Sequence, residues 1–130
     1  MEHCEGQTLS EKLAREGALP EGEARDIVRQ ILDVVVYIAR QKVVHFDLKP
    51  QNIMFQQGLL KVLDFGICKT FDSEHSKMAL TSQGMGTFLY LPPETFMNNP
   101  LLTNKVDIWS LGVIFYEMVS YLRICSPNHI

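Results

Sequence analysis

The most informative stretch of the sequence is residues 45–52, which read HFDLKPQN. It places an acid, Asp47, an amine, Lys49, and an amide, Asn52, in one polar segment between brief apolar runs. The motif Asp-Phe-Gly, residues 64–66, follows directly after two apolar runs that read as a hairpin. The pattern therefore predicts a loop with reactive side chains, set between short strands.

These side-chain types are the ones that phosphoryl transfer requires. A carboxylate such as Asp47 can orient an attacking hydroxyl, and a cation such as Lys49 can meet the charge on a moving phosphoryl group. Asn52 and Asp64 are oxygen donors on adjacent predicted strand ends, which suits a hard cation that keeps part of its water shell. Taken alone, Asp47 reads more simply as a solvated or capping acid, and a lone Asp-Phe-Gly occurs by chance in many chains. The combination of Asp47 with the Asp-Phe-Gly motif favours a catalytic role for these residues.

The composition fits one globular domain. Of the 130 residues, 46% are hydrophobic and 21% are charged, which excludes a disordered tail. No apolar run reaches the roughly 18 residues that span a bilayer, so no membrane segment is expected. The net charge of −3 comes without a Lys/Arg cluster, so direct nucleic-acid binding is not expected. Three widely spaced cysteines fit neither a disulfide framework nor a zinc site and indicate an intracellular location.

Local patterns predict three helices. Thr8 and Glu11 form a capping-box pair that opens a short helix, and Gly17 can close it. A longer amphipathic helix follows, with Pro20 at its first position. A final helix, capped by Asn104, is apolar on nearly every face and is therefore expected to be buried all round. The apolar positions of the second helix are Ala24, Ile27, Val28, Ile31, Leu32, Val35 and Ile38.

Two further motifs lie downstream, GTFLYLPPE at residues 86–94 and DIWSLG at residues 107–112. Together with residues 45–52 and 64–66, they resemble four motifs of eukaryotic protein kinases in the same order and spacing. The likeness covers the catalytic loop, the metal motif, the substrate-binding end of the activation segment and the start of the central helix. It implies an α+β, protein kinase-like fold that is incomplete, mostly the helical C-terminal lobe from the hinge to the central helix.

The resemblance implies a role for each matched residue. Asp47 is the expected catalytic base, Lys49 reaches toward the transferred phosphate, and Thr87 bridges the catalytic loop to the substrate loop. Asn52 and Asp64 are the expected magnesium ligands. ATP and Mg²⁺ are the implied cofactors. A protein with a Ser/Thr acceptor is the implied partner, because Asp-Leu-Lys-Pro-x-Asn is the serine/threonine form of the loop.

The same likeness places the adenine contacts. Met1 falls at the gatekeeper, the backbones of Glu2 and Cys4 fall at the hinge, and Met54 falls on the floor of the adenine pocket. Cys68 lies near this site in sequence, and it reads as a small buried hydrophobe rather than a reactive thiol, because nothing nearby in sequence lowers its pKa.

We expect structural or regulatory roles for several other residues. His45 is expected to pack under Phe65, and Asp107 is expected to accept backbone N–H groups of the catalytic loop. Polar residues between the motifs can either accept phosphate or serve as flexible loop filler, and these are Ser73, Ser76, Thr81 and Ser82.

Within the kinases, the sequence resembles the tousled-like family most. The shared features are Met-Glu-x-Cys-Glu-Gly at residues 1–6, an aromatic residue at position 46 and Leu-Thr-Ser-Gln-Gly-x-Gly-Thr at residues 80–87. A spindle-checkpoint dual-specificity kinase is the second resemblance, because it shares the Pro-Pro-Glu ending. The tousled-like resemblance adds the nucleus as a candidate location.

Three departures from the family pattern shape the expectations. Phe46 stands where most regulated kinases have Arg, and an apolar ring cannot pair with an activation-loop phosphate. No glycine-rich loop precedes Met1, and the likeness ends near Val119. We therefore expect a partial kinase domain over residues 1–120, a divergent tail over residues 121–130, and no activity from this chain alone. The alternative is a non-catalytic kinase fragment or a pseudokinase-like interaction product.

Overall fold

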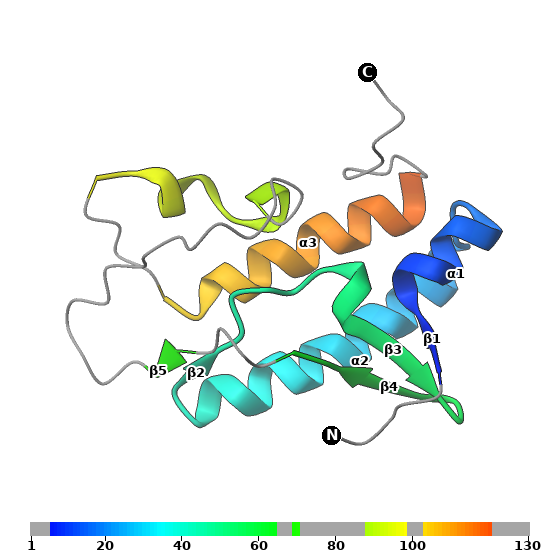
Figure 1. The fold of residues 1–130 in the computed structure, drawn as a ribbon, viewed down its shortest axis with the longest axis horizontal. Coiled ribbons are helices and arrows are strands. Elements are labelled where there is room, and N and C mark those ends of the chain that lie inside the picture. Colours follow the sequence, from blue (N-terminus) through cyan, green and yellow to red (C-terminus); the bar gives the residue numbers. More distant parts are fainter. Residues whose placement is uncertain (1–5, 65–68, 71–87, 99–102, 121–130) are drawn as a thin grey trace.

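The computed structural model describes residues 6–64, 69–70, 88–98 and 103–120, and combines three α-helices with two small sheets (Figure 1). The helices are α1 (Leu9–Glu16), α2 (Glu21–Arg40) and α3 (Lys105–Ser120). The strands are β1 (Gln7–Thr8), β2 (Val43–Val44), β3 (Ile53–Gln56), β4 (Leu59–Val62) and β5 (Lys69–Thr70). Short 3₁₀ turns lie at Pro50–Asn52, Phe88–Tyr90 and Pro93–Phe96.

Helix α1 begins and ends as its sequence predicts. The backbone N–H of Glu11 donates to Thr8 Oγ1 at 3.1 Å, and the N–H of Thr8 donates to Glu11 Oε2 at 2.8 Å. This reciprocal capping box satisfies two N–H groups that the first helical turn leaves unpaired. At the other end Gly17 adopts φ 76°, a conformation that costs glycine little, and its N–H donates to Leu13 O at 3.0 Å.

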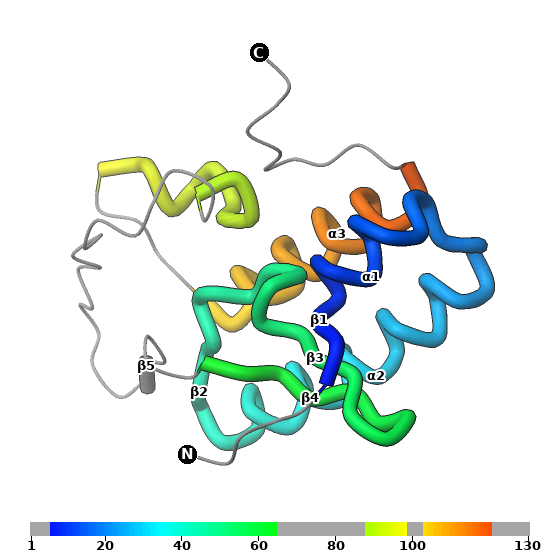
Figure 2. The backbone as a smooth tube through the Cα atoms, turned by 45° about the vertical axis from the view of Figure 1, so that its right-hand side comes forward, coloured from blue at the N-terminus to red at the C-terminus, as the bar shows by residue number. Residues whose placement is uncertain are grey.

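Helix α2 confirms the amphipathic pattern, because its buried residues lie on one stripe. Helix α3 packs against it (Figure 2). The helix begins at Glu21, one residue after Pro20. The buried residues are Ala24, Ile27, Ile31, Val35 and Ile38.

The predicted hairpin forms from β3 and β4, which pair antiparallel with Ile53 opposite Val62. Its turn, Gln57 and Gly58, has positive φ at both residues, at 51° and 78°, as tight hairpin turns require. β1 pairs with the other edge of β3, and the pair β2–β5 forms a separate two-stranded sheet. The hairpin therefore fixes residues 52 and 63, which flank its open end, beside each other.

The main core lies between the helices and the hairpin. It includes Leu9 and Leu13 of α1, Ile53 of β3, and Ile114 and Met118 of α3, all buried. Burying aliphatic side chains of this size contributes about 1.5–3 kcal/mol each. The core therefore ties α3 firmly to the elements that precede and follow the catalytic-type loop.

Helix α3 departs from two expectations. Its first N–H group, that of Lys105, donates to the hydroxyl of Thr103 at 3.3 Å, so Thr103 rather than Asn104 provides the side-chain bond at this end. A threonine hydroxyl reaches the N–H two residues ahead in such turns. The helix is also not covered on every side by the described residues, because Ile108 and Trp109 are each 47% exposed.

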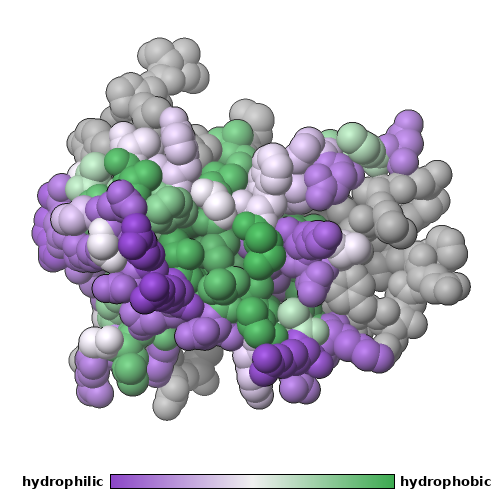
Figure 3. Space-filling model, turned by 180° about the vertical axis from the view of Figure 1, so that it is seen from behind, coloured by the Kyte–Doolittle hydropathy of each residue, from purple (hydrophilic) through white to green (hydrophobic). Residues whose placement is uncertain are grey.

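Apolar side chains also reach the surface on α2, where Leu32, Val36 and Tyr37 are exposed. One face of the molecule presents an apolar area between polar side chains (Figure 3). Among the described helices, none has the length and apolarity needed to cross a membrane.

The exposed face of α3 leads to a prediction for the polypeptide of residues 1–130 expressed by itself. Trp109 and Tyr116 lie seven residues apart, on the same helical face, and are 47% and 53% exposed. Since contiguous exposed apolar surface promotes association, we expect this polypeptide to self-associate and to bind an apolar dye. Sedimentation velocity should show polydisperse species for the unmodified sequence, and substantially less association for Trp109→Glu with Tyr116→Glu.

The matched control is Tyr37→Glu, which removes an exposed tyrosine from α2 instead. It should reduce association less than the α3 pair. A monodisperse, dye-negative 130-residue polypeptide would contradict the prediction.

Candidate active site

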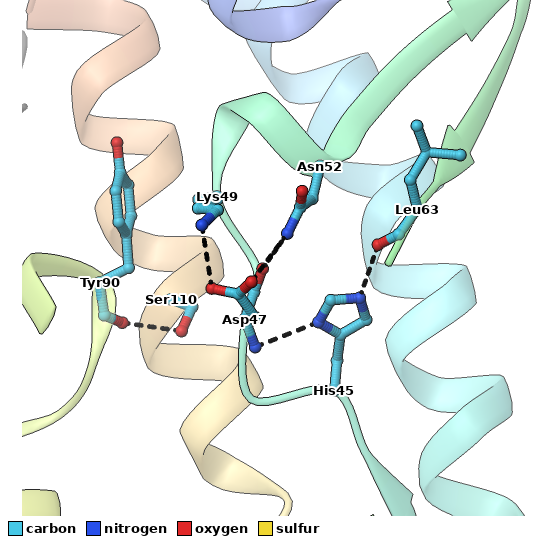
Figure 4. A network of polar contacts seen from close by, with 7 residues as sticks. All are labelled: His45, Asp47, Lys49, Asn52, Leu63, Tyr90 and Ser110. Carbon is cyan, nitrogen blue, oxygen red and sulfur yellow. Dashed lines mark hydrogen bonds and ion pairs between the residues drawn. The ribbon is translucent and has the colours of Figure 1, made fainter. Parts of the chain in front are cut away.

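Residues 45–52 form a largely buried loop that follows β2 and ends in the 3₁₀ turn at Pro50–Asn52 (Figure 4). Its polar side chains are unusually enclosed, with His45 fully buried and Asp47 3% exposed. Buried polar groups require partners, because leaving one unpaired costs about 1–3 kcal/mol. The partners of this loop come from α3, from the hairpin and from within the loop itself.

Asp107 on α3 holds the backbone of the loop. Its Oδ2 accepts a hydrogen bond from the N–H of His45 at 2.8 Å, and its Oδ1 accepts one from the N–H of Phe46 at 3.0 Å. This confirms the expectation that Asp107 accepts N–H groups of the catalytic loop. Burial raises the pKa of the Asp107 carboxyl above its ordinary value, while the hydrogen bonds from His45 and Phe46 oppose that rise.

The imidazole of His45 connects the loop to the hairpin. The backbone N–H of Asp47 donates to His45 Nδ1 at 3.1 Å, so this nitrogen acts as an acceptor and the ring proton lies on Nε2. Nε2 then donates to the carbonyl oxygen of Leu63 at 3.0 Å. The expected contact of His45 with Phe65 lies outside the described residues. The observed bridge is a polar role that the sequence reading missed.

Within the loop, Asn52 and Lys49 surround the carboxylate of Asp47. Asn52 Nδ2 donates to the Asp47 carbonyl oxygen at 2.8 Å and to Asp47 Oδ2 at 3.1 Å. Lys49 Nζ lies 3.3 Å from the other carboxylate oxygen, Oδ1, which forms an ion pair there but accepts no directed hydrogen bond within the described part of the chain. The structure therefore brings three of the predicted site residues together, with one carboxylate oxygen not committed to a hydrogen bond.

The side chain of Asn52 is suited to bind a cation. Because both groups that face its amide are acceptors, the Nδ2 atom must point toward Asp47, which leaves Oδ1 as the atom available to a metal. The N–H of Leu63 donates to the Asn52 carbonyl at 2.7 Å, so the next residue, Asp64, lies at the same end of the hairpin. Asp64 is exposed and has φ 60°, a conformation that Asp tolerates better than most residues.

The oxygen donors of this end fit a magnesium ion better than a metal held by protein alone. Among the described residues, no group of three or more His, Cys, Asp or Glu side chains is placed to hold a metal. Mg²⁺ usually binds through one or two protein oxygens and takes its remaining ligands from phosphate and water. Asn52 and Asp64 match that pattern.

Of the residues predicted to contact adenine, the structure describes only Met54. Met54 lies on β3, opposite Thr8 and Lys61. A Cβ at Gly6 would lie 2.3 Å from the Phe55 carbonyl oxygen and 3.0 Å from Met54 Cγ, so only glycine permits this close approach. The segment that follows the predicted hinge therefore passes directly against the predicted adenine floor. Several other predicted residues lie outside the described residues, namely Met1, Glu2, Cys4, Cys68, Ser73, Ser76, Thr81, Ser82 and Thr87.

A second polar network fixes residues 88–91 onto α3, and the sequence reading did not predict it. Tyr90 Oη donates to Glu117 Oε2 at 2.6 Å, and Ser110 Oγ donates to the Tyr90 carbonyl at 2.7 Å (Figure 4 shows the second bond). Tyr90 and Glu117 are both buried. The one available signal was a glutamate in the mostly apolar second half of α3, since a buried acid requires a donor.

The fold and the site together define a class of protein. The family profile described as "Protein kinase domain" matches residues 1–129, and the chain belongs to this family. The expected α+β kinase fold is thereby confirmed.

The relatives narrow the class. The chain is 46% identical over 126 residues to the serine/threonine-protein kinase TOUSLED of Arabidopsis thaliana, covering 92% of this chain and 18% of the relative. It is 42% identical over 130 residues to the human serine/threonine-protein kinase tousled-like 2, covering 90% of this chain and 17% of the relative. For the tousled-like 1 kinase of Caenorhabditis elegans the identity is 39% over 130 residues, covering 92% of this chain and 14% of the relative.

These similarities confirm the predicted resemblance to serine/threonine kinases of tousled-like type. The chain spans less than a fifth of the length of these curated relatives. The division of the chain at residue 120 stays a prediction, because residues 121–130 lie outside the described residues.

The buried carboxylate of Asp107 gives a pH-dependent prediction. Because its pKa in the folded state lies above the ordinary value of 3.8, the part of its contribution to stability that depends on protonation is fully present below pH 3.8 and is lost as pH rises through the folded pKa. Asp107→Asn removes this titration and leaves only one acceptor for two N–H donors, so it should lower the melting temperature. The difference between the unmodified protein and Asp107→Asn should be largest near pH 4 and should shrink toward pH 8.

Scanning calorimetry of the full-length protein encoded by its gene measures this difference. Asp33→Asn is the matched control, because Asp33 is an exposed acid on α2, and it should change the melting temperature little at any pH. An advantage of Asp107 that grows with rising pH would contradict the prediction.

Proposed function

We propose that the protein containing this chain is an ATP- and magnesium-dependent kinase of tousled-like type that phosphorylates serine and threonine hydroxyls of proteins. The observation that supports this most directly is the grouping of Asp47, Lys49 and Asn52 at the hairpin end that leads into Asp64. The names of the relatives, all serine/threonine-protein kinases, support the same class.

Asp47 is the proposed base. Asn52 donates to its Oδ2 and to its backbone carbonyl, and His45 accepts from its backbone N–H, so three hydrogen bonds from two residues orient Asp47 before any substrate arrives. Its Oδ1 accepts no hydrogen bond within the described residues and is the atom that can accept the proton of a substrate hydroxyl. Such preorganisation supplies most of the catalysis in phosphoryl transfer, which depends on positioning and on electrostatics.

Lys49 covers that same oxygen, with Nζ 3.3 Å away. The ammonium group can also contact a transferred phosphoryl group, and moving toward it would uncover Asp47 Oδ1 for the hydroxyl. One lysine would thus link the presence of phosphate to the exposure of the base. Lys49 also supports the choice of serine and threonine over tyrosine, because it belongs to the Asp-Leu-Lys-Pro-x-Asn form of the loop.

Asn52 Oδ1 and the Asp64 carboxylate are the proposed magnesium ligands. A magnesium ion held by these two residues would neutralise negative charge on the phosphates of the nucleotide. The protein holds Asn52 in a fixed orientation, because its side chain is bonded to Asp47 and its backbone carbonyl to the N–H of Leu63. Binding of the metal and alignment of the base are therefore linked through Asn52.

The rival function is that of a non-catalytic, kinase-like interaction protein. The presence of Asp47, Asn52 and Asp64 favours catalysis, because a protein that only binds partners has no need of this set. The mutual geometry of Asp47 and Asn52 adds to that argument, since two close hydrogen bonds join them.

Two substitutions separate binding from chemistry in the full-length protein. Asp47→Asn should retain nucleotide affinity and lower single-turnover rate by about 10²- to 10⁴-fold, the range for loss of a positioned proton acceptor. Asp64→Asn should weaken both magnesium-nucleotide binding and turnover, because it removes a metal ligand. Nucleotide affinity by calorimetry and phosphate transfer to a generic protein acceptor provide the two measurements.

Asp33→Asn again serves as the control and should match the unmodified enzyme in both measurements. Full turnover by Asp47→Asn would refute the assignment of the base. Absence of any phosphate transfer by the unmodified full-length protein, with magnesium-nucleotide present, would favour the non-catalytic rival.

A further inference from the structure

The aromatic residue before the proposed base is buried rather than presented to solvent. Phe46 is 5% exposed and belongs to a small apolar cluster, separate from the main core. We call this the Phe46 cluster. Its members are Val44, Phe46, Leu91 and Val106, with Phe88 packed against them.

The Phe46 cluster joins three parts of the chain that are distant in sequence. Val44 belongs to β2, Val106 lies in the first turn of α3, and Phe88 and Leu91 belong to the segment that resembles the substrate-binding end of a kinase activation segment. Phe46 itself lies on the loop that carries Asp47. The cluster is therefore a direct apolar contact between the loop that carries the proposed base and the proposed substrate side.

The backbone of Phe46 is held in an unusual conformation. Its φ is 65°, in the left-handed region that a residue with a bulky side chain rarely adopts. Two features keep it there, the hydrogen bond from its N–H to Asp107 Oδ1 and the packing of its ring. A strained residue that the surroundings fix so thoroughly is a reason to look for a function in the fixed geometry.

The segment of residues 88–91 is fixed on two sides. Tyr90 binds it to α3 through Glu117 and Ser110, while Phe88 and Leu91 bind it to the Phe46 cluster. The N–H of Leu91 also donates to the Phe88 carbonyl at 3.1 Å, which keeps these two apolar residues in one turn. Loss of the Phe46 ring would weaken the attachment through the Phe46 cluster, where Val44 and Val106 remain, and would leave the Tyr90 attachment in place.

We propose that Phe46 is a positioning residue for the reaction proposed above: its ring aligns residues 88–91 with Asp47 by apolar packing, in place of a charged contact. The proposal rests on the proposed function and adds to it a statement about regulation. Apolar packing is not screened by salt and does not require a phosphate group. An ion pair with a phosphorylated side chain is weakened by salt and forms only when the phosphate is present. The alignment is then built into the fold and does not await phosphorylation.

The test compares Phe46→Ala and Phe46→Leu in the full-length protein. Misalignment of about 1 Å can cost roughly 100-fold, so Phe46→Ala should lower kcat/KM for a protein acceptor by roughly 10- to 100-fold. The KM for ATP should change less than about threefold, since the Phe46 cluster does not include Met54 of the hairpin. Phe46→Leu, which keeps an apolar side chain in the cluster, should recover most of the loss.

Ile27→Ala is the matched control for lost stability, because Ile27 is equally buried but belongs to the main core on α2. It should lower the melting temperature and leave the kcat/KM of the folded enzyme unchanged. Phosphatase treatment of the unmodified enzyme should reduce its activity by less than about threefold, because no charged contact with the residue before Asp47 is lost.

Each contrary result has a distinct meaning. Unchanged kcat/KM in Phe46→Ala, or a loss that Phe46→Leu fails to recover, would overturn the proposal. Loss of activity after phosphatase treatment would also overturn the proposal. If the unmodified protein transfers no phosphate, the proposed function fails, and amide hydrogen exchange then decides about Phe46. Faster exchange at Leu91 in Phe46→Ala, with α2 unchanged, supports the alignment role, and unchanged exchange at Leu91 refutes it.

Discussion

The proposed site depends on the two hydrogen bonds that the Asp107 carboxylate accepts from the N–H groups of His45 and Phe46. They connect the loop to α3, the helix whose residues Ile114 and Met118 are packed into the main core. Burying this carboxylate is unfavourable, as the raised pKa of Asp107 shows, and the two N–H donors offset the cost. The same bonds hold Phe46 in its left-handed conformation and place the imidazole of His45 between Asp47 and Leu63.

A chain of short contacts then extends from this anchor to the groups that would handle phosphate. His45 joins the N–H of Asp47 to the end of β4, Asn52 joins the Asp47 carboxylate to the end of β3, and the strand pairing keeps those ends adjacent. The proposed base and the proposed metal ligands therefore share one rigid support. An error in the position of the loop would displace all of them together, which is why positioning rather than intrinsic reactivity governs a site of this kind.

Local sequence signals predicted the parts of the fold that local physics determines. The capping box at Thr8, the apolar stripe of α2 and the turn at Gly58 involve neighbours within a few residues, and all three are observed. The grouping of Asp47, Lys49 and Asn52 was likewise predictable, because one short loop carries them. The bridge made by His45, the burial of Phe46 and the bond from Tyr90 to Glu117 were not, since each joins residues 18 to 61 positions apart with no local pattern to mark the pairing.

Amide hydrogen exchange in the full-length protein tests the central claim, that Asp107 organises the loop, most directly. The account predicts that the amides of His45, Phe46 and Asp47 are strongly protected, and that Asp107→Ala increases the exchange of all three together while the amides of α1 keep their protection. If Asp107→Ala exposed only His45 and Phe46, or if none of the three amides changed, the loop would be held by something other than the Asp107 carboxylate, and the account would be wrong.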